Sequence, residues 1–404
     1  MRTRTPGLSA VVLAVAGLLL ATALPAQAAR TDAAVTLGTA TTLTVTGHGW
    51  GHGHGMSQYG AQGAARQGLS FAQILAFYYP GTQLSSLTSS VRVLITADTD
   101  NNTTVRHRAR MRVLDTGNGR WYRLRTKHAP KVWRLRTVHG QTRVYYRTAR
   151  WHLYRTAGRV ALKGAGEFRA SGPLTLRLPS GDRSYRGGLR YVNGDTVNVV
   201  GMENYLKGVV ASEMPPSWQP AALQAQAVAA RTYAAREIAD HAGSYYHLCD
   251  TSRCQVYRGY DGEWSSTNAA VAATSGRILT YQGAPAFTQF SSSSGGWTST
   301  GSQPYLIAQP DIYDKPVDPK LKIGDPHFNW TRSVVVAALE NAYPSIGKLI
   351  SIQIADRDGD AAHPNDGWVV SIVLTGNTGT ATMSGSEFKS LYGLKSAYFS
   401  LSAP

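Results

Sequence analysis

The chain has 404 residues, of which 43% are hydrophobic and 16% are charged, and its formal net charge is +17. This apolar content excludes a globally disordered chain, and the length predicts two or three domains. The charge is concentrated in one segment, because residues 101–190 contain 22 Lys and Arg side chains against three acids, whereas the rest of the chain is close to neutral.

The chain begins with the pattern of a secretory signal peptide. Arg2 and Arg4 precede an uncharged apolar run over residues 7–24, and a small-residue cleavage pattern, Ala-Gln-Ala, ends at Ala28. We therefore expect residues 1–28 to be removed after export; an uncleaved membrane anchor is the alternative, because the run is almost long enough to span a bilayer. No later stretch has that character, so the mature protein is expected to be secreted or held in the cell wall, without a transmembrane segment.

A block of alternating glycines follows over residues 47–60. Alternating glycine disfavours a helix and permits unusual backbone angles, so we expect a loop after a strand at 41–46. Three closely spaced histidines in this loop are compatible with a metal site, but no acidic or cysteine ligand lies nearby, and hydrogen bonding is the alternative role. A helix is predicted over 61–79, ended by Pro80 and Gly81. The loop presents His48, Trp50, His52 and His54.

Residues 91–192 have the pattern of a β-rich region that is also rich in arginine. Strands are predicted at 91–95 and 144–154, and Gly-Asn-Gly at 117–119 predicts a hairpin turn. Arginine fills the polar positions of the strands, which gives the predicted sheet a basic face over 101–190. Outside the cell the counter-charges are acidic wall polymers or anionic lipids, so we expect this face to bind anionic wall polymers and no nucleic acid. The alternative is that the charges only keep an antiparallel sheet soluble.

Residues 193–404 mix helices and strands. A proline followed by small apolar residues predicts a closely packed helix over 220–240, and a shorter helix is expected over 203–212, before a double-proline turn. The Ser/Gly-rich segment 291–298 is a flexible linker or a ligand-binding loop, and it lacks the nucleophile elbow of a serine hydrolase. The other expected elements are a strand at 197–200, two segments flanking a turn at 282–283, a helix at 333–342, strands at 350–355 and 368–374, and a helix at 385–392.

Two further segments have features of metal sites. Cys249 and Cys254 are the only cysteines, and in an exported protein such a close pair indicates a disulfide; a zinc site completed by His247 or His241 is the alternative. The acidic run at 356–360 lacks the glycine position and terminal glutamate of a calcium loop, so we expect a hairpin turn there. We therefore expect neither a metal nor another cofactor.

Glu213 is the strongest candidate for catalytic chemistry. It lies where the predicted helix meets the double-proline turn, next to Met214 and without an adjacent cation. A carboxyl in partly apolar surroundings has a raised pKa and can donate a proton near neutral pH. The alternative is a buried glutamate that caps a loop.

Several stretches resemble the motifs of one family, the stage II sporulation protein D family (SpoIID/LytB). They comprise residues 204–234, 249–259 and 291–298, together with the Gly/His block and its continuation to Gly81. In the usual order of that family the Gly/His block comes last, whereas here it comes first, so the chain resembles a circular permutant. We therefore expect residues 41–81 to pack against the C-terminal tail, 350–401, with Thr46 and Ser400 on the same side of the molecule.

The resemblance implies lytic transglycosylase activity on peptidoglycan glycan strands, particularly strands stripped of stem peptides, with Glu213 as general acid and then base. Ordinary glycosidases need two carboxylates, but in lytic cleavage the muramic acid 6-hydroxyl attacks its own anomeric carbon, so one carboxyl is enough. Arg231 and Tyr233 would orient Glu213, or would only pack their helix. Sugar hydroxyls or developing charge would be bound by His52, Ser57, Gln289, Ser291 and Ser293.

The expected fold class is α+β, with mixed or antiparallel sheets and a few helices in a crescent-like arrangement of several lobes. The expected divisions are the signal peptide 1–28, the segment 29–90 with the Gly/His block, the basic β region 91–192 and the catalytic core 193–404. Two alternatives to the enzyme stay open. One is a non-catalytic wall-binding protein or an enhancer of a wall amidase, and the other is an adhesive or polyanion-binding protein.

Overall fold

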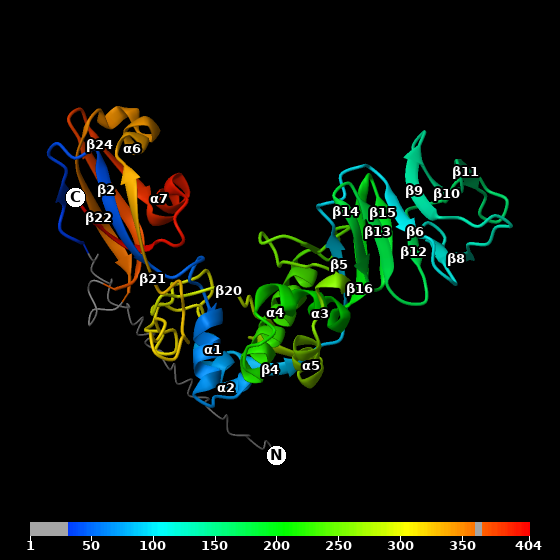
Figure 1. The fold of residues 1–404 in the computed structure, drawn as a ribbon, viewed down its shortest axis with the longest axis horizontal. Coiled ribbons are helices and arrows are strands. Elements are labelled where there is room, and N and C mark those ends of the chain that lie inside the picture. The colour runs from blue at the N-terminus through cyan, green and yellow to red at the C-terminus, as the bar shows by residue number, and fades with distance from the viewer. Residues whose placement is uncertain (1–30, 360–365) are drawn as a thin grey trace, which may run out of the picture.

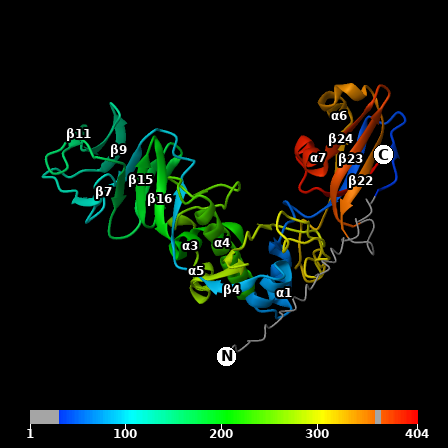
Figure 2. The same cartoon turned by 180° about the vertical axis from the view of Figure 1, so that it is seen from behind.

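The computed structural model describes residues 31–359 and 366–404, so the predicted signal peptide lies outside the described residues. Three lobes form an open V, seen in Figure 1 and from behind in Figure 2. A helical lobe forms the base, a β-rich lobe rises on one side, and a lobe that contains both ends of the described chain rises on the other. Three hydrophobic clusters provide their cores. The α+β class predicted from the sequence is confirmed.

The terminal lobe joins the two ends of the described chain through strand β2 (Thr42–His48). One edge of β2 pairs antiparallel with β25 (Tyr398–Ser402), and Thr46 lies directly opposite Ser400. The other edge pairs with β21 (Asn329–Val335). The expected meeting of the N-terminal segment with the C-terminal tail is therefore confirmed for this strand, while the permuted order of the motifs stays an interpretation.

The predicted helix at 333–342 is wrong in its first turn. The chain is still extended at Val334, which lies opposite Leu43 in the β2–β21 pair, and helix α6 (Ala337–Ala342) begins only after the run of valines. Three consecutive β-branched residues favour a strand, and the pairing with β2 keeps this segment extended. The predicted helix α7 (Gly385–Tyr392) is present and begins with a capping box at Ser384.

A four-stranded sheet completes the terminal lobe, in the order β1-β22-β23-β24. The acidic run at 356–360 was expected to be a turn; Asp356 and Asp358 instead belong to β22, and residues 360–365 lie outside the part of the chain that the structure describes. The strands are β1 (Val35–Thr36), β22 (Leu349–Asp358), β23 (Trp368–Gly376) and β24 (Thr380–Ser384).

The helical lobe is built around α4 (Pro220–Asp240), whose bounds are those predicted from the proline and the small residues. The single helix expected at 61–79 is in fact two helices, because Gly68 adopts a φ of +89° and Ser70 then caps a new helix. A hairpin turns at Gln282 and Gly283, as predicted. The remaining elements are α1 (Gln58–Arg66), α2 (Phe71–Tyr78), α3 (Met202–Glu213), α5 (Ser265–Ala273), β4 (Gln83–Ser86), β18 (Arg277–Tyr281) and β19 (Ala284–Pro285).

The β-rich lobe consists of a seven-stranded and a six-stranded sheet that share one core. Trp133, Leu135 and Phe168 are fully buried in that core. The seven-stranded sheet has the order β17-β5-β16-β15-β12-β7-β8, and the six-stranded sheet the order β11-β10-β9-β6-β13-β14. The predicted turn at 117–119 joins β7 to β8, whereas the stretch 144–154 forms a hairpin rather than one strand.

The lobe boundaries differ from the divisions expected from the sequence, because β16 and β17 belong to the β-rich lobe and the terminal lobe takes strands from both ends. Within residues 31–359 and 366–404, no helix is both long and apolar enough to cross a membrane. The strands of the β-rich lobe are β5 (Ser90–Leu94), β6 (Thr103–Arg106), β7 (Arg112–Asp115), β8 (Arg120–Arg123), β9 (Val132–Val138), β10 (Gln141–Arg147), β11 (Trp151–Tyr154), β12 (Gly166–Arg169), β13 (Leu174–Leu178), β14 (Gly181–Tyr185), β15 (Gly188–Val192), β16 (Asp195–Gly201) and β17 (Leu248–Cys249).

Candidate active site around Glu213

Glu213 is the last residue of α3, and Met214 then turns the chain into the extended double-proline segment. The carboxyl is half-buried, and burial raises the pKa of Glu213 above its ordinary value. The backbone N–H of Val256 donates a hydrogen bond to its Oε1 at 2.9 Å, which opposes the rise. The hydrogen bond therefore holds the carboxyl in a fixed direction, and the raised pKa favours its protonated form.

Gln58, the first residue of α1, brings the Gly/His block to this carboxyl. Its side-chain amide approaches Glu213 and lowers the carboxyl pKa, against the larger effect of burial. Gln58 is 7% exposed, and its Nε2 makes no hydrogen bond of ordinary geometry within the described part of the chain. A buried donor without a hydrogen bond of ordinary geometry, beside this carboxyl, is available to a ligand. Gln58 is not among the residues predicted from the sequence, although it directly follows Ser57 in the Gly/His block.

A short parallel pairing fixes the Gly/His block next to the Ser/Gly segment. Strand β3 (Met56–Ser57) pairs with β20 (Phe290–Ser291), so Ser57 lies opposite Ser291. Ser57 also caps α1 by accepting a hydrogen bond from the N–H of Gly60 at 3.0 Å. The pairing therefore positions the start of α1, and with it Gln58, relative to the rest of the lobe.

The predicted hydroxyl ligands come together, but two of them face inward. Ser57 Oγ and Ser293 Oγ donate to Asp314 Oδ2 at 2.9 and 3.2 Å, and both serines are almost fully buried. Ser291 accepts a bond from the N–H of Gly53 at 3.3 Å. The carbonyl of Gln289 accepts bonds from the Tyr79 hydroxyl and the Met56 N–H. These residues hold the loops of the site in place.

Three buried aspartates that are not predicted from the sequence, Asp311, Asp314 and Asp325, hold these loops together. Asp314 accepts bonds from the serines, and Asp311 accepts from the Tyr78 hydroxyl and from Ser294. Burial, followed by the charge of Asp314, raises the pKa of Asp311 and of Asp325 to about 7. The three lie in an irregular segment, with no periodic pattern to mark them as buried.

His52 and His54 stack on each other, with ring centroids 5.0 Å apart. His52 Nδ1 accepts a hydrogen bond from the backbone N–H of His54 at 3.0 Å. Burial, with a smaller contribution from His54, lowers the pKa of His52 to about 4, so this ring is neutral at physiological pH. Among residues 31–359 and 366–404, no group of three or more His, Cys, Asp or Glu side chains is arranged to hold a metal ion.

Within the described residues, neither Arg231 nor Tyr233 makes a hydrogen bond to the Glu213 carboxyl or shifts its pKa. Arg231 is fully buried and binds both carboxylate oxygens of Glu203, at 2.9 and 2.7 Å, near the start of α3. Ten residues, or about 15 Å of helix, separate Glu203 from Glu213. Tyr233 stacks on Phe287. This placement fits the packing alternative: Arg231 anchors the far end of the helix that carries Glu213.

Cys249 and Cys254 are joined as a disulfide, with their Cα atoms 5.5 Å apart. The Nδ1 of His247 accepts a hydrogen bond from the backbone N–H of Arg92. His241 contacts Glu237, one turn earlier in its own helix. The disulfide loop leads directly to Val256, so it helps to place the N–H that binds Glu213.

Aromatic rings continue from the site along the surface. Trp218, in the turn that follows Glu213, packs against Tyr59 with centroids 4.9 Å apart. Tyr59 in turn lies near His327, whose ring contacts Trp50 at 4.5 Å. Tyr59 and Trp218 also line a cavity of about 850 Å³. Large amphipathic rings with polar edges are suited to an extended ligand with apolar faces and hydroxyl groups.

The fold is α+β and has several lobes. Its candidate site combines a half-buried glutamate at a helix end with a Gly/His block packed beside it, and these features together define the class of protein. The family model described as "Stage II sporulation protein" matches residues 191–281. The stage II sporulation protein D of Bacillus amyloliquefaciens is 32% identical over 257 residues, which cover 58% of this chain and 68% of the relative. The chain belongs to this family, and the resemblance seen in the sequence is confirmed.

Two relatives from Bacillus subtilis (strain 168) match over shorter regions. A protein named amidase enhancer is 36% identical over 164 residues, which cover 39% of this chain and 21% of the relative. Its stage II sporulation protein D is 34% identical over 185 residues, which cover 40% of this chain and 50% of the relative. The matched regions thus span half or less of these two relatives.

Proposed function

We propose that this protein is a lytic transglycosylase that cleaves the glycan strands of peptidoglycan outside the cell membrane. The family and the name of the amidase-enhancer relative support a role at the cell wall. The observation that supports the chemistry is the state of Glu213: a half-buried carboxyl with a raised pKa, oriented by one backbone N–H. Among the described residues, no second carboxylate contributes to this shift.

The reaction needs one acid that later acts as a base. Protonated Glu213 gives its proton to the glycosidic oxygen, and the bond from that oxygen to the anomeric carbon of muramic acid breaks. The resulting carboxylate takes the proton of the muramic acid 6-hydroxyl, whose oxygen bonds to the same anomeric carbon and forms a 1,6-anhydro ring. No water is consumed, so the second carboxylate of a hydrolase is not needed. Gln58 Nε2 can donate to the carboxylate or to a sugar oxygen.

The test compares wild-type protein with Glu213→Gln on glycan strands stripped of stem peptides. The amide keeps the size and the acceptor for Val256 but carries no acidic proton. We expect 1,6-anhydro-muramyl ends from the wild type and a loss of at least about a hundredfold in the variant, the contribution of a general acid. Anhydro ends from both proteins at equal rates would contradict the assignment of Glu213.

The amidase-enhancer relative supports a second candidate function, the stimulation of a wall amidase without cleavage of glycan. If neither wild type nor Glu213→Gln produces anhydro ends, both proteins are added to a wall amidase acting on intact peptidoglycan. Equal stimulation of peptide release by the two would favour this second candidate.

A further inference from the structure

The outer face of the six-stranded sheet carries a concentration of arginines that the proposed reaction does not use. Side chains alternate along its strands: on β9, Trp133 and Leu135 are buried in the core, so Arg134 and Arg136 point to the opposite, outer face. The register of the neighbouring strands adds further arginines to that face. We call this set the arginine face: Arg106, Arg134, Arg136, Arg143, Arg147 and Arg177.

The register of β9 and β10 places like charges side by side. Arg136 lies directly opposite Arg143, and like charges in that position destabilise a sheet. Burial has the largest effect on the pKa of Arg134 and lowers it; the charge of Asp100 comes next and raises it, and Arg136, Arg147 and Arg177 lower it further. The folded sheet therefore keeps an excess of positive charge, only partly offset by Asp100, that its own stability does not require.

Few acids compensate this charge. Asp182 pairs with Arg106 and Arg177 at one end of the face. Within the described ranges, the arginines of β9 and β10 have no ion pair with an acidic side chain. Arg143 also has its Nε buried without a hydrogen-bond partner. A guanidinium N–H that is buried without a hydrogen-bond partner can donate to an acceptor that a ligand supplies.

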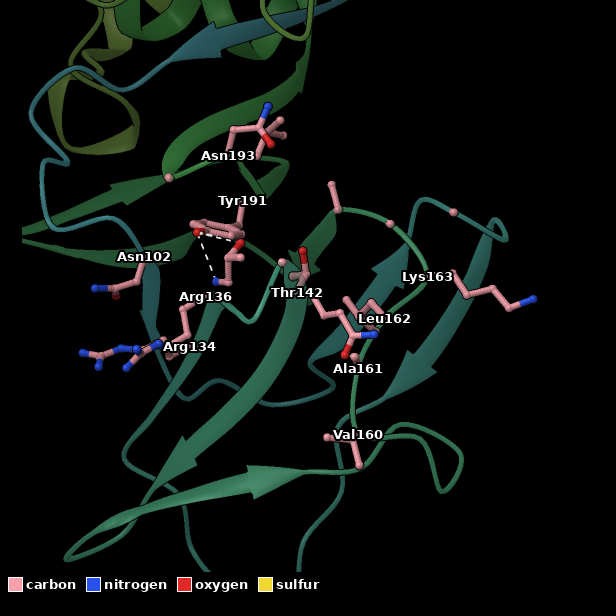
Figure 3. A pocket seen from close by; sticks show the side chains of 18 of the residues that line it. Asn102, Arg134, Arg136, Thr142, Val160, Ala161, Leu162, Lys163, Tyr191 and Asn193 are labelled. Carbon is pink, nitrogen blue, oxygen red and sulfur yellow. Dashed lines mark hydrogen bonds between the residues drawn. The ribbon is translucent and has the colours of Figure 1, made fainter.

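A cavity of about 1750 Å³ adjoins the face at the end of the β9–β10 hairpin (Figure 3). Arg134 and Arg136 line it, and Figure 3 shows them beside each other on the same strand. Arg159 and Lys163 add two cations from the loop opposite. The face thus adjoins a cavity whose charged lining consists of Arg134, Arg136, Arg159 and Lys163 against one acid, Asp100.

The aromatic residues of the face distinguish between kinds of polyanion. Proteins that bind single-stranded nucleic acid stack its bases on exposed rings. Here the ring of Trp151 is covered by the guanidinium groups of Arg134, at 4.0 Å, and Arg147, at 5.9 Å. Tyr145, opposite Arg134 on the same face, keeps a partly exposed ring, but the face presents mainly guanidinium groups, which suits a chain of anionic groups.

We propose that the arginine face and its cavity bind a linear polyol-phosphate polymer of the cell wall. Guanidinium groups pair in a forked geometry with phosphate oxygens, and the strand spacing presents them at intervals of about 5–7 Å. The face ends at β14, where the N–H of Ser184 binds Asp261, and a cavity of about 300 Å³ is lined by Asp182 from β14 and by Ser212, which precedes Glu213 in α3. A polymer bound there would hold the active site against the wall. This binding is independent of the proposed reaction.

The experiment measures binding of purified poly(glycerol phosphate) to the full mature chain by calorimetry. The test variant carries Arg134→Gln, Arg136→Gln, Arg143→Gln and Arg147→Gln. The control carries the same change at four exposed arginines outside the face, Arg108, Arg120, Arg125 and Arg155, so both lose the same net charge. We expect the test variant to lose at least about tenfold in affinity and the control less than about threefold, with wild-type binding weaker at higher salt.

A double variant, Arg136→Gln with Arg143→Gln, separates binding from folding. Because it removes the like-charge pair, we expect its melting temperature to stay equal or rise while its affinity for the polymer falls. Equal losses in the test and control variants, or no binding by the wild type, would overturn the proposal. So would tighter binding of poly(U) RNA or of anionic lipid vesicles than of the polyol phosphate at the same salt concentration.

Discussion

At the scale of single residues, two opposing influences set the protonation of Glu213. Burial favours the neutral acid, whereas the Val256 N–H and the Gln58 amide favour the carboxylate, and burial is the larger effect. The proposed reaction needs both forms in turn: the acid to protonate the leaving oxygen and the carboxylate to accept the hydroxyl proton. A site that balances the two forms supports both steps better than a fully exposed or fully apolar carboxyl would.

This balance predicts the pH dependence of cleavage. Because Glu213 must begin protonated, the rate should fall as the pH rises through its raised pKa. Gln58→Leu removes a group that lowers this pKa, so the falling limb should move to higher pH, by less than about one unit. The measurement is the rate of anhydro-end formation against pH for both proteins. An unchanged limb, in a variant whose melting temperature is also unchanged, would exclude Gln58 as a neighbour that tunes Glu213.

Glu213 could be predicted as a candidate from the sequence, whereas its partner Gln58 could not, for a physical reason. Glu213 is marked locally, by the helix end and the double-proline turn that follows it. Gln58 reaches it only because β3 pairs with β20, a contact between segments more than two hundred residues apart. Likewise the buried Asp311, Asp314 and Asp325 have no local pattern, since their burial depends on serines that come from other loops.

At the scale of elements, helices were predicted well where a residue at the helix start, such as a proline or a capping serine, fixes the position of that start. Pro220 begins α4 and the Ser384 capping box begins α7, and both helices were predicted with their observed bounds. The failures come from tertiary contacts and single backbone positions. Gly68 divides the helix expected at 61–79, and pairing with β2 keeps Val334 extended.

Helix α1 shows how packing reverses a propensity. Glycine inside a helix normally costs about 1 kcal/mol relative to alanine, yet a Cβ at Gly63 would lie 2.1 Å from the carbonyl oxygen of Tyr313. We therefore expect Gly63→Ala to lower the free energy of unfolding by about 1–3 kcal/mol, the range of an overpacked core. Gly243→Ala, where a Cβ would meet nothing within 4 Å, is the matched control and should change it by less than about 0.5 kcal/mol. Urea denaturation measures both, and a stabilised Gly63→Ala would show that α1 packs less closely than described.

At the scale of the whole molecule, the chain order and the spatial order differ. The first described strands complete the terminal lobe, the chain then forms the helical and β-rich lobes, and it returns to the terminal lobe at β21. The Gly/His block is thus held between two lobes, with β2 on β25 and β3 on β20. Because the ends of the described chain share one lobe, the fold depends little on where the chain begins.

This arrangement predicts that a circular permutant folds. The variant begins at Thr82, runs to Pro404, continues through a flexible linker of about 12 residues to residue 31, and ends at Gly81. The new ends lie in a turn where a Cβ at Gly81 would meet no atom within 4 Å, and the cut loosens only the bonds that Thr82 makes to the carbonyl of Tyr79. It also places the Gly/His block after the C-terminal tail, the order that the sequence resemblance implies for the family. We expect cooperative unfolding with a Tm within about 5 °C of the wild type, and retained glycan cleavage.

A second permutant, opened inside α4 between Ala225 and Gln226, is the control, because both residues are fully buried in the helical lobe. It should fail to fold, since two charged chain ends cannot be buried there without compensation. Equal stability of the two permutants would mean that the position of the ends does not matter at all. Failure of the first permutant alone would mean that the order of synthesis, and not only the final contacts, decides how the lobes assemble.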